Sequence, residues 1–548
     1  MLYAICIVND NILVMYNNPV SLHQALRGQH PKFCYQSANW QVVDGELQLS
    51  WLFKTSPHLE FNPQMAIPLP VDFALDEAKK AVIDNLVFQI GLVEMLSYWK
   101  ATTSPQIIIR AGSLTSDQIN WWHKLLIKGL GEYFFTNQID FTQPDFVTIQ
   151  TTQKQEDSQT QTGKFNIQAD LVTVVTNHPD QTKLNRTKLE PTPLNPKVVS
   201  HSPTTATQPG QTQSKPTVSK YLIPLGGGKD SIVTLELLRQ YQKTKPLSSQ
   251  LLGLAINPTP ATRQISQLAD LPLIEVRRRL DPKLFDLNNQ NYLNGHTPFS
   301  ALVAVTSMLV AYLYDCPQIV LSNEKSSNEG NTQYLGQSVN HQYSKTFEFE
   351  SDFRDYVQAN IQPILPEDQT APNYFSLLRP FFELKIGQLF ARLGKDYFSV
   401  FRSCNRGQKT GVWCGECAKC LFAFSILFPF LGEDMTTKIF GQNLFQNPRL
   451  DSVALELMGQ KATKPFECVG THQESKVAFD LSSQWYLQKN QPLPHVLLQL
   501  QDLLAQYPDL PGQAKQILDN WDEHHFIPQD LVSFLFSQKK IVRDLLDK

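Results

Sequence analysis

Residues 221–242 read YLIPLGGGKDSIVTLELLRQYQ, and the fold of the chain is best understood outward from them. The first five residues have the apolar character of a buried strand, and the last twelve have the apolar spacing of a helix. Between them stand Gly226, Gly227 and Gly228, followed by Lys229, Asp230 and Ser231. Glycines let the backbone approach a ligand closely, and the helix start adds the positive end of its dipole. The stretch therefore predicts a phosphate-binding loop between a strand and a helix.

This loop differs from two common phosphate-binding motifs. Asp230 stands where the Walker A motif has Ser or Thr, and Ile223 stands where that motif has its first glycine. The GxGxxG motif is also excluded, because a third glycine is missing at the required spacing. A tight turn whose glycines serve only packing is the alternative interpretation.

Strands and helices alternate after the loop, in the order typical of a parallel sheet. The predicted strands are 221–225, 251–257, 271–276 and 318–322, and the predicted helices are 231–242, 261–270 and 298–314. The N-terminal region contains two strands separated by Asn9 and Asp10, helices near 75–100 and 116–130, and a strand at 106–112. The fold class predicted from these patterns is α/β, with a mostly helical tail.

Composition divides the chain further. Residues 151–219 are rich in Thr, Gln, Pro and Ser, so they bury too little apolar surface to offset the entropy of ordering. We expect a flexible linker there, with a short strand around 164–176. The other predicted units are an N-terminal α/β domain at 1–150, a catalytic domain at 220–480 and a helical region at 481–548.

Charge and hydropathy restrict the class of protein. The 48 Lys and Arg residues against 51 Asp and Glu residues give a net charge of -3, which does not favour a nucleic-acid or membrane-surface partner. The apolar stretches 298–314 and 421–431 are too short or too interrupted to span a bilayer, and predict buried core helices. The first residues lack the features of a secretory signal. We therefore expect a soluble cytoplasmic protein.

A second polar cluster, SNEKSSNEGNT at 322–332, follows the predicted strand 318–322. Ligands of open parallel sheets bind at the carboxyl ends of strands, so Glu324, Lys325 and Glu329 should face the same crevice as the glycine loop. The nearby stretch 339–350 adds His341 and Lys345. A solvated polar turn, and for His341 an ordinary surface or core histidine, are the alternatives.

Four cysteines lie within seventeen residues: Cys404, Cys414, Cys417 and Cys420. Four thiolates at this spacing suit a tetrahedral Zn²⁺ site, and a site with four protein ligands is closed, which indicates a structural role. An iron–sulfur cluster and simple buried thiols are the alternatives. Cys468 is separate from this cluster, and is either a core residue or a thiol close to the chemistry.

The sequence Gly-Gly-x-Asp-Ser after a first strand resembles the pyrophosphate (PP) loop of the ATP-pyrophosphatase superfamily, which has the adenine nucleotide alpha hydrolase-like fold. This chain departs from the superfamily at Gly226, where most members carry Ser. The resemblance implies that Gly226, Gly227, Gly228, Lys229 and Ser231 hold the phosphates of ATP. It also implies that Asp230 binds Mg²⁺. The cysteine spacing is similar to that of 7-cyano-7-deazaguanine synthases, which belong to the same superfamily.

Seven motifs together resemble ATP-dependent UDP-N-acetylmuramoyl-L-alanyl-L-glutamate epimerases, the MurL type. They are IGLVEMLSYWKATTSP (90–105), LGGGKDS (225–231), NGHTPFSALVA (294–304), LSNEKSSNEGN (321–331), VNHQYSKTFEFE (339–350), WCGECAKCLF (413–422) and KPFECVG (464–470). The resemblance covers residues 75–135 and 220–480. It implies an isomerase of peptidoglycan and cell-wall biosynthesis that inverts the terminal L-Glu of UDP-MurNAc-L-Ala-L-Glu while ATP is split to AMP and diphosphate.

The resemblance leaves the proton-transfer residues open. By position, the candidate catalytic residues are Lys229, Glu324, Lys325, Glu329 and His341. A rival arrangement pairs Cys468 with a cysteine of the four-cysteine cluster. The run Arg277 to Arg279 could steer an anionic nucleotide sugar, although a solvated basic turn is the preferred interpretation.

Two other functions stay open at this point. One is an amide- or nitrile-forming, or thiolating, enzyme similar to 7-cyano-7-deazaguanine synthase. The other is a catalytically inactive scaffold that binds a nucleotide or a cell-wall partner. The intact sequence Lys229-Asp230-Ser231 argues against the scaffold.

Overall fold

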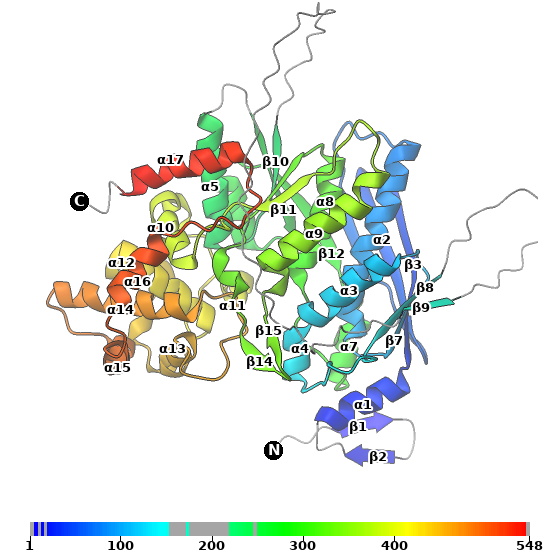
Figure 1. The fold of residues 1–548 in the computed structure, drawn as a ribbon, viewed down its shortest axis with the longest axis horizontal. Coiled ribbons are helices and arrows are strands. Elements are labelled where there is room, and N and C mark those ends of the chain that lie inside the picture. The colour runs from blue at the N-terminus through cyan, green and yellow to red at the C-terminus, as the bar shows by residue number, and fades with distance from the viewer. Residues whose placement is uncertain are drawn as a thin grey trace, which may run out of the picture.

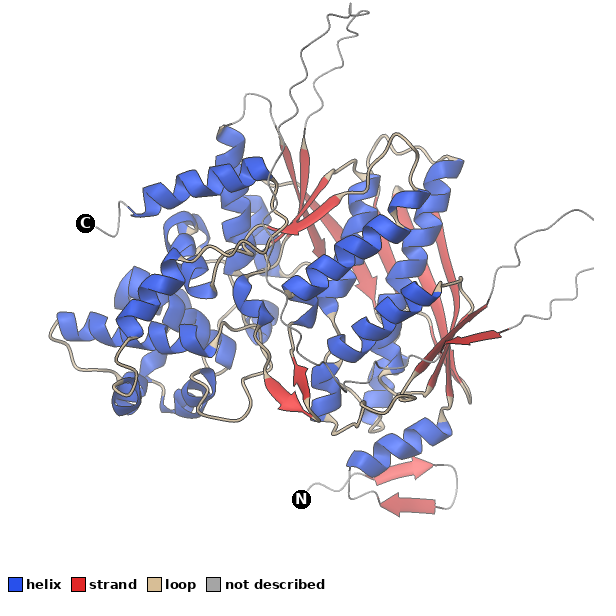
Figure 2. Cartoon of the chain, viewed as in Figure 1, coloured by secondary structure: helices blue, strands red, loops and turns tan. Residues whose placement is uncertain are grey.

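The computed structural model describes residues 5–8, 12–15, 19–152, 171–174, 219–244 and 249–543, so most of the predicted linker lies outside the described residues. Its centre is a 12-stranded sheet with helices packed against it (Figure 1). Figure 2 shows a helical region beside this sheet, and the colours of Figure 1 show that the later part of the chain builds it. The predicted α/β class and the helical C-terminal region are confirmed.

The large sheet combines strands from both halves of the chain. From one edge to the other they are β16 (Asn373–Ser376), β13 (Gln318–Leu321), β10 (Lys220–Pro224), β11 (Gln250–Ile256), β12 (Leu273–Arg279), β6 (Gln64–Pro68), β4 (Glu46–Thr55), β3 (Lys32–Val43), β7 (Gln106–Ile109), β8 (Thr148–Thr152) and β9 (Leu171–Val174), with β5 (Leu59–Phe61) beside β4. Two small antiparallel pairs are β1 (Ile5–Val8) with β2 (Ile12–Met15), and β14 (Thr332–Tyr334) with β15 (Gln337–Val339).

The helices confirm each helix predicted from apolar spacing, within a few residues. The helices that accompany the sheet are α1 (Pro19–Gln29), α2 (Glu77–Trp99), α3 (Ser116–Gly129), α4 (Gly131–Thr136), α5 (Lys229–Lys243), α6 (Pro260–Leu268), α7 (Lys283–Asn289), α8 (Phe299–Leu313) and α9 (Phe347–Asn360). The later helices are α10 (Glu383–Leu393), α11 (Asn405–Thr410), α12 (Ala418–Phe440), α13 (Asp451–Leu457), α14 (His472–Gln488), α15 (His495–Leu504), α16 (Leu510–Asp519) and α17 (Gln529–Arg543).

The parallel part of the sheet has the strand order that creates a binding crevice. Strand β10 is central, with β11 and β12 on one side and β13 and β16 on the other, all parallel. The chain therefore adds β11 and β12 on one side of β10 and the later strands β13 and β16 on the other side, so the strand order reverses between β10 and β13. Ligands in such sheets bind outside the carboxyl ends of the strands at this switch point. The glycine loop follows β10 and the polar loop at 322–331 follows β13, so the fold directs both toward one crevice.

Strand β12 also joins the two halves of the chain, because it pairs antiparallel with β6 of the N-terminal half. Arg277, Arg278 and Arg279 make this pairing, so they lie in a strand and the predicted basic turn is wrong. The pairing with β6 extends β12 through the arginines. Inside the fold, Arg278 donates to the buried carboxylate of Glu94 on α2, with Nε 2.8 Å from Oε2.

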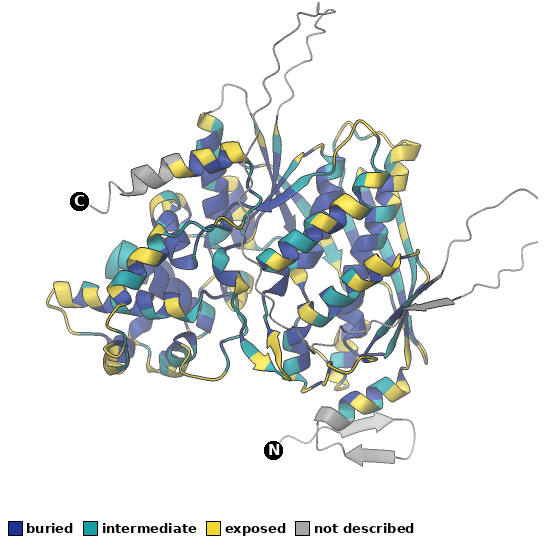
Figure 3. Ribbon diagram, viewed as in Figure 1, coloured by how far each residue is buried: buried dark blue, intermediate teal, exposed yellow. Residues whose placement is uncertain are grey.

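Alternate residues of the parallel strands face two different hydrophobic cores. Leu222 and Ile319 pack into one core together with α2 and α8. Their neighbours Ile223 and Val320 pack into the other, which contains residues of α5, α10 and α12. Figure 3 shows buried residues in the strands of the sheet and in the helices beside them. The boundaries predicted between domains stay a prediction, although the first core draws residues from both the N-terminal half and the parallel strands.

Within the part of the chain that the structure describes, two helices, α2 and α12, are long and apolar enough to cross a membrane by length and composition. In the structure, 78% of the most apolar window of α2 and 56% of that of α12 are buried. The apolar stretch 421–431 forms part of α12, which kinks where Gly432 adopts a φ of +72° after Pro429. The stretch 298–314 forms α8, whose inner face is buried. All three helices are thus part of the packed interior, as expected for core helices.

One buried ion pair holds the loops at the crevice. Arg379 and Glu350 are each 1% exposed, and the Arg379 guanidinium lies 2.7 Å from the Glu350 carboxylate. Arg379 also donates to the backbone carbonyls of Glu324, at 2.8 Å, and Lys345, at 2.7 Å. Glu350 accepts from the backbone N–H and the hydroxyl of Ser376 at the end of β16. The pair therefore fastens α9 and β16 to the two loops that enter the crevice.

We expect Glu350→Gln to lower the unfolding free energy by about 3–5 kcal/mol, because it leaves the Arg379 charge buried without a partner. Urea unfolding followed by tryptophan fluorescence measures this change. The control is Glu275→Gln, which breaks a bidentate but exposed pair with Arg263 and should leave the midpoint unchanged. Equal midpoints for the two variants would contradict the role given to Arg379.

Candidate active site

The glycine loop ends at the start of α5, which begins at Lys229, two residues before the predicted position. Gly228 is the N-cap residue, and none of the side chains that the structure describes caps it, so the first amides of α5 are free for an anion. The glycines also serve packing: a Cβ on Gly227 would lie 3.1 Å from the Arg402 carbonyl, and one on Gly228 would lie 3.1 Å from the Ser403 hydroxyl. Packing therefore requires glycine at these two positions, and phosphate binding by the loop stays a prediction.

Lys229 is buried, with 4% of its surface exposed. Its Nζ lies 2.5 Å from Asp230 Oδ1 and also contacts the carboxylate of Glu383 at the start of α10. Burial lowers the pKa of Lys229, but the two carboxylates outweigh burial and raise it, so the lysine stays charged. Burial, together with Asp230, raises the pKa of Glu383 well above its ordinary value. The resulting Lys229–Glu383 pair places a fixed cation under the glycine loop.

A cleft of about 350 Å³ opens at this point. Its lining includes the glycine loop, the ends of β10, β11 and β13, and side chains that lie far apart in the sequence. The polar residues that line it include Asp230, Ser231, Asn257, Thr259, Thr262, Ser300, Asn323, Lys345, Ser403, Gln408, Lys419 and Cys468. The cleft therefore joins the predicted phosphate loop to a reactive thiol.

Glu324 is buried beside this cleft at 3% exposure. Burial raises the pKa of its carboxyl, Lys345 lowers it, and Asp230 raises it again. The carboxylates of Asp230, Glu324 and Glu383 thus act on one another around Lys229 and Lys345. Asp230, the predicted Mg²⁺ ligand, is the one of the three that lines the cleft.

Lys325 and Glu329 make contacts away from the cleft. The Nζ of Lys325 lies 3.0 Å from a carboxylate oxygen of Asp522 in the C-terminal region. Glu329 Oε1 accepts from Lys464 Nζ and from the His472 backbone N–H, each at 3.1 Å. Both residues therefore tie the loop at 325–329 to the helical region, and a catalytic role for them stays a prediction.

His341 lies in a chain of polar contacts that ends at Cys468. Its Nδ1 contacts the carboxylate of Glu132 on α4, and its ring also interacts with the Cys468 thiol. Burial lowers the pKa of His341, but the bonds to Cys468 and Glu132 outweigh it and raise the pKa to about 9. Lys345 Nζ donates to Cys468 Sγ at 3.2 Å. Burial raises the pKa of Cys468, but Lys345 and the neighbouring cations lower it well below its ordinary value.

The sequence alone does not identify Glu132 or Glu383. Glu132 is 209 residues from His341, and Glu383 is 154 residues from Lys229, so no local spacing marks either pair. Lys100, in the motif at 90–105, is a third such residue: it donates to the Gly295 carbonyl and to Thr297 Oγ1. Burial, with a smaller effect from Arg278, lowers the pKa of Lys100 to about 8.

The four-cysteine cluster lies directly behind the glycine loop. The sulfur atoms of Cys404, Cys414, Cys417 and Cys420 all lie within 4.8 Å of one another. Cys404 is the N-cap of α11 and Cys417 that of α12, so helix starts direct the thiols inward. The Arg402 backbone N–H, two residues before Cys404, donates to the Gly227 carbonyl at 2.6 Å. The thiols are therefore placed to bind a metal ion that would support the loop from behind.

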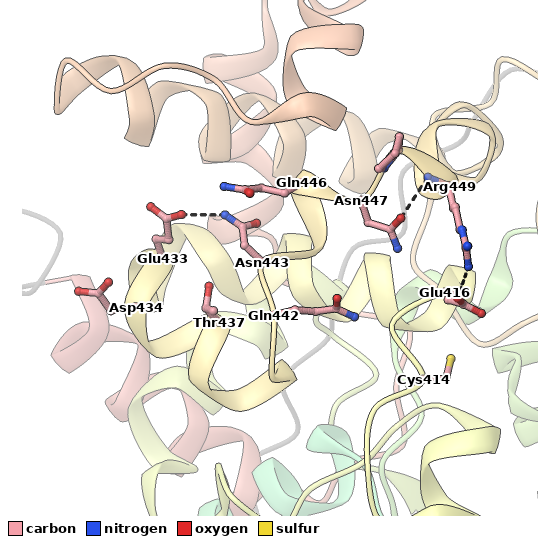
Figure 4. A pocket seen from close by; sticks show the side chains of 11 residues that line it. Cys414, Glu416, Glu433, Asp434, Thr437, Gln442, Asn443, Gln446, Asn447 and Arg449 are labelled. Atoms are coloured by element: carbon pink, nitrogen blue, oxygen red, sulfur yellow. Dashed lines mark hydrogen bonds and ion pairs between the residues drawn. The ribbon is translucent and has the colours of Figure 1, made fainter.

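A larger cavity of about 830 Å³ borders this cluster at Cys414 (Figure 4). Its polar groups largely bond one another, since Asn443 donates to Glu433 at 2.8 Å and Arg449 to Glu416 at 3.0 Å. Nothing in its lining corresponds to a thiol–imidazole pair or a glycine loop. The smaller cleft is therefore the candidate active site, on chemical grounds and not on size.

We expect purified protein to carry about one zinc ion per chain, and Cys417→Ser to lose it, because tetrahedral zinc needs all four thiolates. Loss of the metal should also weaken ATP binding about tenfold, through the contact between the Arg402 and Gly227 backbones. Elemental analysis and calorimetry measure the two effects, with Cys34→Ser as the control. Iron, or a metal-free wild-type protein, would refute the zinc assignment.

The chain matches two family models, the MurL N-terminal domain over residues 25–174 and 186–377, and the MurL C-terminal domain over residues 400–508. A UDP-N-acetyl-alpha-D-muramoyl-L-alanyl-L-glutamate epimerase of Salinispora tropica is 38% identical over 264 residues, 47% of this chain and 55% of that protein. Proteins of the same name from Xanthomonas oryzae pv. oryzae and Micromonospora sp. are each 28% identical, over 79% and 85% of this chain and 82% and 90% of theirs. No solved structure matches. The chain therefore belongs to the MurL family.

Proposed function

We propose that this protein is a cytoplasmic enzyme of peptidoglycan synthesis that inverts the terminal L-Glu of UDP-MurNAc-L-Ala-L-Glu to D-Glu. ATP activates the substrate as an acyl adenylate, and AMP and diphosphate are the by-products. The observation that carries the proposal is the single cleft that contains the glycine loop, Asp230, Lys345 and Cys468. The names of the similar proteins supply the substrate.

The chemistry of the substrate explains why such a cleft needs a nucleotide. The nitrogen of a peptide-bound glutamate is in an amide, so it cannot form an imine with a pyridoxal cofactor. Its α-proton is also hard to remove beside an ionised carboxylate, because the carbanion would add a second negative charge. Adenylation removes the first charge and leaves an acyl group that can stabilise an enolate. A site for ATP beside acid–base groups is what this reaction requires.

The chain's residues have distinct roles in this proposal. The amides at Gly226, Gly227 and Gly228 and the hydroxyl of Ser231 bind phosphate at the start of α5. Lys229, held by Glu383, supplies positive charge below the loop. Asp230 would hold Mg²⁺, with Glu324 behind it, and the ion would offset the charge of the diphosphate leaving group. These roles are those of the PP-loop superfamily, to which we assign the parallel-sheet region.

Proton exchange belongs to the other end of the cleft. His341 is the predicted acid–base candidate that interacts with the Cys468 thiol of the cleft lining, while a carboxylate, Glu132, orients its ring. An imidazole held in this way can accept or return a proton at a carbon beside it. Because Glu132 comes from α4, the N-terminal half of the chain contributes directly to this arrangement.

The test is one incubation of the full chain with Mg²⁺, ATP and UDP-MurNAc-L-Ala-L-Glu in D₂O. We expect AMP, diphosphate, D-Glu after hydrolysis and one deuterium at Cα, as the products of activation followed by proton exchange. Chromatography, chiral analysis and mass spectrometry measure these four products.

The matched variants are Asp230→Asn in the cleft and Asp286→Asn on the exposed face of α7. The first should reduce AMP formation at least about a hundredfold, since it removes the proposed Mg²⁺ ligand, and the second should leave it unchanged. AMP without inversion would reject the epimerisation, and inversion without ATP would reject the adenylation.

A further inference from the structure

The proposed function places Cys468 in the cleft but gives its thiol no chemical step. It lies in the loop before α14 (His472–Gln488) as a free, half-buried thiol, separate from the four-cysteine cluster. Its side chain faces the same cavity as the glycine loop and Asp230. An acyl group bonded to a phosphate on that loop would therefore lie in the cavity that Cys468 lines.

The partners of Cys468 are those of an activated nucleophile. Lys345 Nζ lies 3.2 Å from Sγ, and His341, in the same loop as Lys345, also acts on the charge of this sulfur. Glu132 in turn orients the His341 ring through Nδ1. A thiol beside an imidazole that a third group holds in place is the arrangement that enzymes use for covalent catalysis. The added lysine favours the thiolate, which is the nucleophilic form.

A metal site is the competing interpretation of these residues. Glu132, His296 and His341 have ligand atoms within 4.8 Å of one another, which is compatible with a bound ion. Two cations, however, Lys100 and Lys345, act on His296 at this place. A divalent ion would be repelled by both lysines, whereas a thiolate and a carboxylate balance them. The charges therefore favour a thiolate–imidazole–carboxylate array over a metal centre.

A general base is the other role open to Cys468. Two neighbouring cations stabilise the thiolate. This stabilisation lowers the basicity of the sulfur by its full amount. Nucleophilicity falls less, with a Brønsted coefficient of about 0.4–0.5. The surroundings of Sγ thus suit attack on a carbonyl better than removal of a carbon-bound proton. Transfer to sulfur would also remove the charged phosphate from the activated carboxyl before the α-proton leaves.

We propose that Cys468 is a catalytic residue that attacks the acyl adenylate and carries the glutamyl group as a thioester during epimerisation. This proposal rests on the proposed function. The thiolate forms the C–S bond, the bond between the carbonyl carbon and the AMP oxygen breaks, and its electron pair leaves on the phosphate of AMP. Proton exchange then takes place on the thioester. Water finally cleaves the C–S bond. The products are the glutamate carboxylate, the free thiol of Cys468 and one released proton.

The test separates three roles of Cys468 by two readouts, ATP–diphosphate exchange and AMP release. In Cys468→Ala we expect the substrate-dependent exchange to persist, because adenylation does not use the thiol. AMP release should fall by about 10³-fold, as expected for loss of a nucleophile. If Cys468 were only a base, the adenylate would still hydrolyse and AMP would appear without inversion. If the residue served only binding or folding, exchange would be lost as well; either result overturns the proposal.

Direct trapping gives the second measurement. His341→Gln, which retains Lys345 beside the thiol, should accumulate the intermediate because the imidazole is missing for the later proton transfers. Acid quenching and peptide mapping should find the substrate, less one water, on Cys468, and the double variant with Cys468→Ala should lack it. If His341→Gln loses exchange, rapid quenching of the wild type takes its place, and failure to find the adduct there refutes the thioester.

Matched controls keep the result interpretable. Cys34→Ala changes a half-buried thiol on β3, away from the cleft, and should leave both readouts unchanged. Cys468→Ser tests whether the alanine variant fails for reasons of folding. A wild type that shows neither exchange nor AMP with this substrate would refute the proposed function itself, and not the role of Cys468.

Discussion

The active-site cleft depends on one buried guanidinium. Arg379 donates to the carboxylate of Glu350 and to the backbone carbonyls of Glu324 and Lys345, which follow different strands and helices. Because a buried charge must be paired and fully hydrogen-bonded, this network allows one relative position of those two loops. The charge of Glu324 acts on Asp230 and Lys345 donates to Cys468, so the same interaction holds both residues at the cleft.

The sequence predicts the features whose signals are local. The strand–loop–helix at 221–242, the helices with apolar spacing and the close cysteine spacing all lie in short stretches, and the structure confirms the elements there. The hairpin of β3 and β4 is not among the predicted elements, although the alternation of Leu47, Leu49, Trp51 and Phe53 is the signal that could have identified it. The pairs Glu132–His341 and Lys229–Glu383 depend on tertiary contacts across the sheet, which no spacing encodes.

The continuous sheet explains how the two halves of the chain share one site. Antiparallel pairing of β6 with β12 aligns the N-terminal strands with the parallel strands, and α2 packs against α8 across the join. Arg278 and Glu94 neutralise each other at this contact, so the join contains an ion pair as well as apolar surface. Helix α4, at the end of the N-terminal half, then reaches His341 through Glu132.

The buried ion pairs of the cleft are better explained by a functional role than by a contribution to the stability of the fold. Lys229 is paired with Glu383, Lys345 with Cys468 and His341 with Glu132, all in partly or fully buried positions. Burying such pairs seldom stabilises a fold, since well-packed apolar residues of the same volume often do as well or better. Their arrangement instead places preorganised charges of both signs around one cleft, as a site that binds charged groups requires. A chain that retained only its fold would not need three such pairs around one cleft.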